Sequence, residues 1–93
     1  MTAIRSKRQA VLKLAADHGA VNVRIFGSEA RGDARPESDV DLLVDMSAGR
    51  SLLDLVALGQ DLEDLLGRPV DVVTPAALAP ELRAAILADA RPL

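Results

Sequence analysis

The stretch that decides the fold covers residues 27–42 and reads GSEARGDARPESDVDL. Before it, residues 21–26 alternate in polarity with a period of two, which predicts a strand that ends at the first glycine. Residues 28–38 predict a short turn of helix, closed by Gly32, and then a loop. Residues 39–45 alternate again. The stretch therefore predicts two strands that are joined by a helical turn and a loop.

The remainder of the chain predicts longer helices and a third strand. We expect helices over residues 2–18, 51–66 and 80–90, and a strand over residues 70–74. Ser51 is a typical N-cap for the middle helix, and Gly67 is a typical stop. No repeat or long linker divides the sequence. We therefore expect one domain over residues 1–93, of the α/β (α+β) class, in which a small three-stranded sheet packs against about four helices.

The composition excludes several classes of site. The 93 residues carry 11 Lys and Arg against 14 Asp and Glu, for a net charge of −3, with no Cys, one His and a single aromatic residue, Phe26. A disulfide framework, a thiolate zinc site and a Ser-His-Asp triad are therefore not expected. The acidic balance and the lack of rings argue against direct nucleic-acid binding. No apolar run approaches the ~20 residues of a membrane span, and residues 1–8 do not resemble a secretory signal, so we expect a cytoplasmic protein without a membrane partner.

Three carboxylates form the candidate catalytic group. Asp39 and Asp41 lie two residues apart on a predicted strand, so their side chains share a face with Cα atoms about 6.5–7 Å apart. Asp71 joins them if its strand is the neighbouring one. Two carboxylates about 6 Å apart repel by roughly 3 kcal/mol at an effective dielectric of 20, and a divalent cation such as Mg²⁺ or Mn²⁺ would reverse that sign. The polar face of a half-exposed strand would show the same Asp-x-Asp spacing.

A candidate phosphate site precedes these carboxylates. Gly27 follows a strand and Ser28 opens the short helix, where unpaired N–H groups and a hydroxyl can donate to an anion. An ordinary Ser N-cap beside a glycine turn is the alternative. No Gly-Lys-Ser/Thr sequence occurs, so a Walker-type loop is excluded.

These motifs carry a resemblance to a known family. The sequence GSEARG at 27–32, followed by SDVDL at 38–42, resembles the signature of the DNA polymerase β-type nucleotidyltransferase superfamily. More narrowly, it is similar to the minimal nucleotidyltransferase (MNT) domains that act as antitoxins beside HEPN-domain toxins. Asp71, in PVDVV at 69–73, stands at the place of the third carboxylate, so the resemblance covers essentially the whole chain. It implies a nucleotidyltransferase fold with a small mixed sheet.

The resemblance also implies roles for individual residues. The catalytic residues would be Asp39, Asp41 and Asp71, which would bind two Mg²⁺ ions (or Mn²⁺). Asp71 would also act on the acceptor hydroxyl, as a base or through the metal. The phosphates of ATP would be held by Gly27, Ser28 and Arg31. A surface pair of Arg31 with Glu29 or Asp33 is the alternative for that arginine. Glu29 stands where the family often has a basic residue, and Ser38 is expected to brace the loop.

The function implied by the resemblance is the Mg²⁺-dependent transfer of AMP from ATP to a hydroxyl, expected to be a tyrosine, of a cognate HEPN ribonuclease toxin. This modification would neutralise the toxin, and a hetero-oligomer with it is expected. The family's small-molecule enzymes resemble this core with an added helical domain, so we expect a partner to complete the acceptor site. Two alternatives stay open: an antitoxin that acts by binding alone, and a small-molecule nucleotidyltransferase completed by a separate helical subunit.

Overall fold

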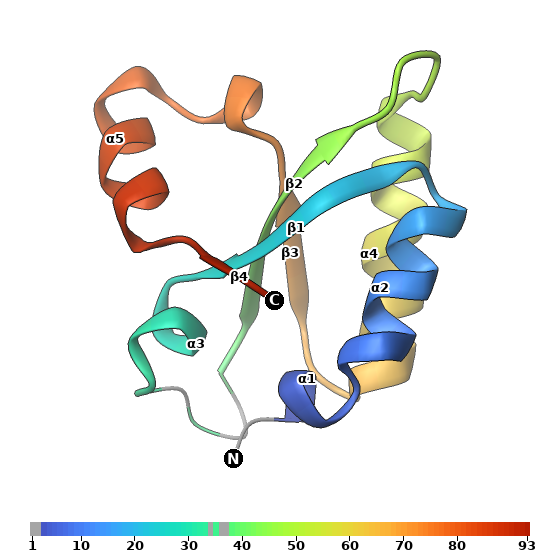
Figure 1. Cartoon of the computed structure of the whole chain (residues 1–93), viewed down its shortest axis with the longest axis horizontal. Coiled ribbons are helices and arrows are strands. Elements are labelled where there is room, and N and C mark those ends of the chain that lie inside the picture. The colour runs from blue at the N-terminus through green and yellow to red at the C-terminus, as the bar shows by residue number, and fades with distance from the viewer. Residues whose placement is uncertain (1–2, 34, 36–37) are drawn as a thin grey trace.

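A four-stranded sheet forms the centre of the computed structural model, which describes residues 3–33, 35 and 38–93 (Figure 1). The strands are β1 (Ala20–Phe26), β2 (Val40–Met46), β3 (Val70–Val73) and β4 (Arg91–Pro92). Their order is β3-β2-β1-β4, with β2 and β3 parallel and β1 antiparallel to both β2 and β4. The sheet is therefore mixed, as expected, but it has one strand more than predicted.

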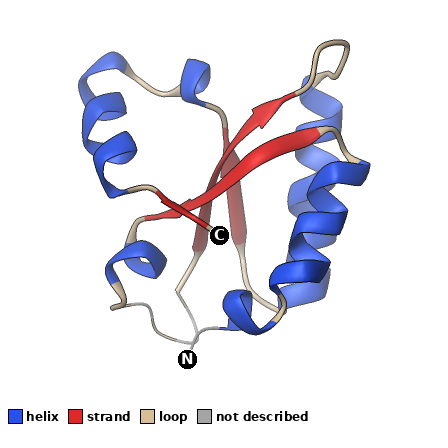
Figure 2. Cartoon of the chain, in the orientation of Figure 1, coloured by secondary structure: helices blue, strands red, loops and turns tan. Residues whose placement is uncertain are grey.

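Helices lie on both faces of this sheet. They are α1 (Ala3–Ser6), α2 (Arg8–Asp17), α3 (Ser28–Arg31), α4 (Leu52–Leu66) and α5 (Pro80–Asp89), with a 3₁₀ turn η1 (Pro75–Ala77). α2 and α4 cover one face, whereas α3 and α5 lie on the other (Figure 2). No helix in the described ranges is both long enough and apolar enough to cross a membrane.

The main core lies between the sheet and the pair α2 and α4. The strand period puts Val40, Leu42 and Val44 on this face, and all three are fully buried. α4 contributes Leu58 and Leu62 at helical spacing, both also fully buried. Each such side chain contributes about 1.5–3 kcal/mol relative to an exposed one. The opposite face of β2 is thereby left for the predicted carboxylates.

α4 confirms the prediction for the middle helix. Ser51 is its N-cap, and the Ser51 N–H donates to Asp54 Oδ2 at 2.9 Å. Gly67 ends the helix with a φ of 67°, a left-handed conformation that favours glycine. The same N–H bond is the main cause that lowers the pKa of Asp54. The local sequence pattern was sufficient to predict this helix, because each of its ends carries a capping residue.

The first predicted helix is divided in the structure. Residue 2 lies outside the described residues, and α1 and α2 are separated at Lys7, whose N–H donates to Ile4 O at 3.3 Å in a tight turn. The Lys7 side chain reaches Leu65 O near the end of α4, with its Nζ donating at 2.9 Å. This break lets Ile4 turn into the core, where it is fully buried. The uninterrupted helix over residues 2–18 is therefore wrong.

β4 is the strand that the sequence pattern missed. Arg91 and Pro92 pair antiparallel with β1, and the Leu93 N–H donates to Val23 O at 3.2 Å. Leu93 itself is only 7% exposed and joins the core. A two-residue strand that contains proline has no measurable period, and both of its residues are exposed, so only its pairing with β1 reveals it.

Candidate active site

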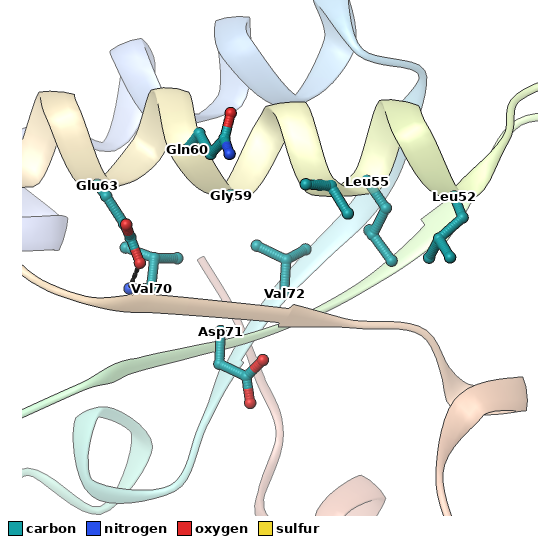
Figure 3. Close-up of a pocket in the computed structure, with 9 residues that line it drawn as sticks. Leu52, Leu55, Gly59, Gln60, Glu63, Val70, Asp71 and Val72 are labelled. Atoms are coloured by element: carbon teal, nitrogen blue, oxygen red, sulfur yellow. Dashed lines mark hydrogen bonds between the residues drawn. The ribbon is translucent and has the colours of Figure 1, made fainter.

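Asp41 and Asp71 lie side by side on neighbouring strands. The parallel register of β2 and β3 pairs Asp41 with Asp71, and such strands are about 4.8 Å apart. Figure 3 shows Val70 and Val72 pointing from β3 toward α4, whereas Asp71 points to the opposite side. The expectation that Asp71 joins the carboxylate face is therefore confirmed as geometry.

Gly27 brings the candidate phosphate turn against the same carboxylates. The preceding residue, Phe26, is the register partner of Asp41 across β1 and β2. Gly27 has φ 68° and ψ −145°, a conformation that other residues rarely adopt. A Cβ atom on Gly27 would lie 2.6 Å from Asp41 Oδ2. The glycine thus leaves room for the Asp41 carboxylate and starts α3 at Ser28 beside it.

The electrostatic environment of Asp41 is negative. Burial raises the pKa of this half-buried carboxyl, and the neighbouring Asp71 and Asp39 raise it further. Arg31 opposes the shift, and Glu29 adds a smaller push in the same direction as the aspartates. Asp39 and Asp71 therefore both act on Asp41, and a bound cation would relieve this repulsion.

The donor set fits Mg²⁺ or Mn²⁺, although the side chains do not yet converge. Within the described part of the chain, no three Asp, Glu, His or Cys side chains already surround one point as metal ligands. Asp39 and Asp71 are exposed, so rotation about their side-chain torsions can bring their oxygens toward Asp41 without moving the backbone. Oxygen-only donors suit a hard divalent cation. The assignment of these three residues as ligands stays a prediction.

Arg31 makes two ion pairs on the surface of this region. Its Nη1 lies 3.3 Å from Asp89 Oδ2 of α5, and its Nε lies 3.6 Å from Asp33 Oδ2. The pair with Asp33 was one of the two expected alternatives, whereas a pair with Glu29 is not formed. The side chain is 52% exposed, so these pairs can exchange for another anion at little cost. The phosphate-binding role of Arg31 stays a prediction.

Glu29 and Arg68 form a buried ion pair that sequence reasoning missed. Arg68 Nη2 lies 2.6 Å from Glu29 Oε1, and the two side chains are 9% and 0% exposed. The geometry of this contact does not meet the angular requirement for a hydrogen bond, and neither carboxylate oxygen of Glu29 accepts a hydrogen bond from any other group. Nothing in the spacing of two residues so far apart in the chain signals this pair. Glu29 therefore faces inward rather than toward a ligand.

Ser38 braces the loop before β2, as expected. Its Oγ accepts a hydrogen bond from the Arg35 N–H at 2.9 Å, and its own N–H donates to Arg35 O at the same distance. The neighbouring residues 34, 36 and 37 lie outside the described residues. These two bonds hold the loop just before Asp39, and neither of them connects Ser38 to the Gly27 turn.

A groove of about 280 Å³ lies between α4 and β3 on the other side of the sheet. Leu52, Leu55, Gly59 and Val72 are among its lining residues. Figure 3 shows that the Asp71 side chain points away from this groove. Asp71 is itself one of the lining residues, but its carboxylate lies on the opposite side of β3, so the groove does not contain the candidate catalytic carboxylates.

Known proteins resemble this chain over most of its length. The family model described as Nucleotidyltransferase domain matches residues 5–93. A Methanocaldococcus jannaschii protein that is provisionally named a protein adenylyltransferase is 40% identical over 87 residues, which cover 94% of this chain and 94% of that protein. Protein adenylyltransferase MntA of Thermococcus cleftensis is 39% identical over 71 residues, which cover 76% of this chain and 72% of MntA.

Solved structures share the fold. One, provisionally described as a minimal nucleotidyltransferase, matches with a TM-score of 0.88 and 54% identity over 100% of this chain and 97% of its own. A chain from the complex of tri-AMPylated Shewanella oneidensis HEPN toxin with MNT antitoxin matches with a TM-score of 0.71 and 19% identity over 95% of this chain and 69% of its own. The first likeness confirms the expected fold class, and the second shows the fold alone.

Proposed function

Because the chain belongs to the nucleotidyltransferase domain family and is itself a nucleotidyltransferase, we propose that it transfers AMP from ATP to a hydroxyl of a partner protein. Its resemblance to minimal nucleotidyltransferases is confirmed. The observation that carries the proposal is the Asp41–Asp71 register beside a glycine turn that leaves room for the Asp41 carboxylate. This juxtaposition puts a candidate phosphate site and a candidate metal site on one face of the sheet.

In the proposed reaction, the acceptor oxygen attacks the α-phosphorus of ATP. A new O–P bond forms, the bond to the bridging oxygen of the β-phosphate breaks, and pyrophosphate leaves. Asp71, the most exposed position of the parallel pair, accepts the proton of the hydroxyl. The N–H groups at the start of α3 and the Ser28 hydroxyl donate to the β- and γ-phosphates.

Asp39, Asp41 and Asp71 would hold the Mg²⁺ ions. When bound, Mg²⁺ neutralises charge on the triphosphate and aligns the attacking and leaving oxygens. Arg31 exchanges its surface carboxylates for the triphosphate, whose greater charge favours this exchange. These roles account for the repulsion at Asp41, because a cluster of like charges is stabilised by a cation.

The partner that we propose is a HEPN toxin, which is modified on tyrosine and thereby neutralised. Support comes from the name of the MntA relative and from the shared fold with an MNT antitoxin in complex with an AMPylated HEPN toxin. The site is open on its outer face, since Asp39 and Asp71 are exposed. A partner can therefore present a hydroxyl to it without any rearrangement of the sheet.

The test combines the chain, its HEPN partner, Mg²⁺ and ATP, and measures the mass of the partner. We expect the mass to rise by one AMP residue per modified hydroxyl with the wild type, and not with Asp39→Asn/Asp41→Asn. Asp45→Asn is the matched control, because Asp45 lies on the same strand but pairs with Asn22 at 3.0 Å. Equal AMP addition by the double variant would refute the proposal. Neutralisation of the toxin by the double variant would instead support an antitoxin that acts by binding alone.

A further inference from the structure

We propose that Arg68 is the positioning residue that fixes Asp39 and couples it to the phosphate turn. This inference rests on the proposed function, because it assigns Arg68 a task toward the metal-binding carboxylates. Arg68 lies in the turn between α4 and β3, only three residues before Asp71. Its side chain is 9% exposed, and its hydrogen bonds and ion pair go to Ser38, Arg35 and Glu29 rather than to the three aspartates.

The first connection of Arg68 is to the loop that leads into Asp39. Its Nε and Nη2 both donate to Ser38 O, at 3.1 and 2.8 Å, and Nη2 also lies 3.4 Å from Arg35 O. Ser38 O belongs to the peptide group that precedes Asp39, so these bonds set the orientation of that peptide plane. The planar fork of the guanidinium allows two donors to hold one carbonyl, which a lysine cannot do.

The turn that contains Arg68 also holds the residue after Asp39. The Val40 N–H donates to Pro69 O at 2.9 Å. Asp39 is therefore held on both sides by consecutive residues of one turn, through Ser38 on one side and Val40 on the other. Asp39 itself is exposed, so its position depends on this bracket rather than on packing of its own side chain.

The second connection of Arg68 is to α3. Arg68 Nη2 lies 2.6 Å from Glu29 Oε1, and the Glu29 side chain is fully buried. Glu29 directly follows Ser28, the first residue of α3. One guanidinium thus joins the start of the phosphate turn, the approach to Asp39 and the approach to Asp71. This role explains why the Glu29 carboxylate is buried without a hydrogen-bond donor: its negative charge holds the Arg68 guanidinium in place.

The inference is tested by Arg68→Lys, which keeps the charge and removes the fork. Groups that orient metal ligands change metal affinity by about 10–100-fold when they are substituted, so we expect Mn²⁺ binding, measured by calorimetry without a partner, to weaken about tenfold. The matched control is Arg83→Lys. Arg83 also donates to two backbone carbonyls, Pro75 O at 3.1 Å and Leu78 O at 3.2 Å, but at the η1 turn. The control should change Mn²⁺ affinity less than twofold.

A double-mutant cycle separates positioning from general loss of structure. If Arg68 acts through Asp39, Arg68→Lys in an Asp39→Asn background has no further effect on Mn²⁺ affinity. Amide exchange provides a readout without metal, and we expect the Val40 N–H to lose protection in Arg68→Lys and not in Arg83→Lys. If Arg68→Lys fails to fold, Glu29→Gln takes its place, with an expected loss in Mn²⁺ affinity of about threefold because the guanidinium keeps its carbonyl bonds.

The outcomes distinguish this inference from the proposed function. Unchanged Mn²⁺ affinity in Arg68→Lys, or an equal loss with and without Asp39→Asn, overturns the positioning role while the wild type still binds and transfers. A wild type that binds no Mn²⁺ overturns both. A wild type that binds Mn²⁺, shows the expected cycle and transfers no AMP overturns the proposed function alone.

Discussion

Asp41→Asn should stabilise the protein in the absence of divalent cations. The variant removes one negative charge from a half-buried position whose pKa is raised by burial, by Asp71 and by Asp39. Carboxylates about 6 Å apart repel by roughly 3 kcal/mol at a dielectric of 20. Because this face is open to solvent, screening lowers the repulsion between Asp41 and each neighbouring aspartate to about 0.5–1 kcal/mol. The two neighbouring charges together suggest a gain in the free energy of unfolding of about 1 kcal/mol.

The gain is measurable as a shift in thermal unfolding. For a domain of this size, about 1 kcal/mol corresponds to about 4–8 °C in Tm. At pH 7 without Mg²⁺, Asp41→Asn should therefore unfold several degrees above the wild type. The matched control, Asp45→Asn, should not gain stability, because Asp45 lies 3.6 Å from Arg24 and loses an attractive pair. The two substitutions on one strand thus have opposite expected signs.

The pH dependence of this gain follows from the direction of the pKa shift. A raised pKa in the folded state means that ionised Asp41 destabilises the fold at pH values above that pKa. As the pH falls through the folded pKa, the wild-type carboxyl is protonated and the repulsion is lost. The difference in stability between Asp41→Asn and the wild type should therefore be largest near pH 7. It should disappear at pH values below the ordinary pKa of an aspartate.

Mg²⁺ should reverse the order of stability. At a concentration tenfold above Kd, a ligand of the folded state adds about 1.4 kcal/mol, so the wild type should gain several degrees while Asp41→Asn gains little. The reasoning is refuted if Asp41→Asn is no more stable than the wild type at pH 7 without Mg²⁺. It is also refuted if Mg²⁺ raises the Tm of both proteins equally.

Three further substitutions test other parts of the structure. Gly27→Ala places a Cβ against the Asp41 carboxylate at a positive φ, so it should cost about 1–3 kcal/mol in urea unfolding and reduce AMP transfer. Leu93→Ala removes a nearly buried side chain from the core and should cost about 2 kcal/mol in the same assay. Asp89→Asn releases the arginine at the end of α3 and should lower the KM for ATP about twofold, with little change in stability because the pair is exposed.

The first two of these substitutions have controls in the same chain, and the third has an outcome that would contradict it. Gly32→Ala also forces a positive φ but meets no atom within 4 Å, so it should leave AMP transfer intact. Leu53→Ala truncates a side chain that is 79% exposed and should change stability by less than about 0.5 kcal/mol. A higher KM for ATP in Asp89→Asn would contradict the exchange of carboxylates that we propose for Arg31.

Much of the fold could be predicted because it depends on patterns within single segments. α4 begins after Ser51 and ends at Gly67, as expected, since capping residues act on their own helix. The period of two placed Asp41 on the face of β2 opposite the buried Val40, with Asp39 at the same parity just before the strand begins. These features require no knowledge of which other segment lies beside them.

The candidate site could be predicted only in part. Asp71 carries the right residue type, but its place beside Asp41 depends on β3 running parallel to β2 in that register. The clash that forbids a side chain at Gly27 likewise needs β1 beside β2, because the obstructing oxygen belongs to Asp41. Whether these residues bind metal and phosphate stays a prediction that the experiments above address.

The sequence by itself determined the strand–turn–strand order, the shared face of Asp39 and Asp41, and the resemblance that points to nucleotidyl transfer. Only the tertiary structure decided that Arg68 pairs with Glu29 and that Leu93 completes the core. The physical reason is that a pattern reports how one segment distributes its polar and apolar side chains. The partner of a buried charge, or of a two-residue strand, is chosen instead by the segments that burial of the core brings together.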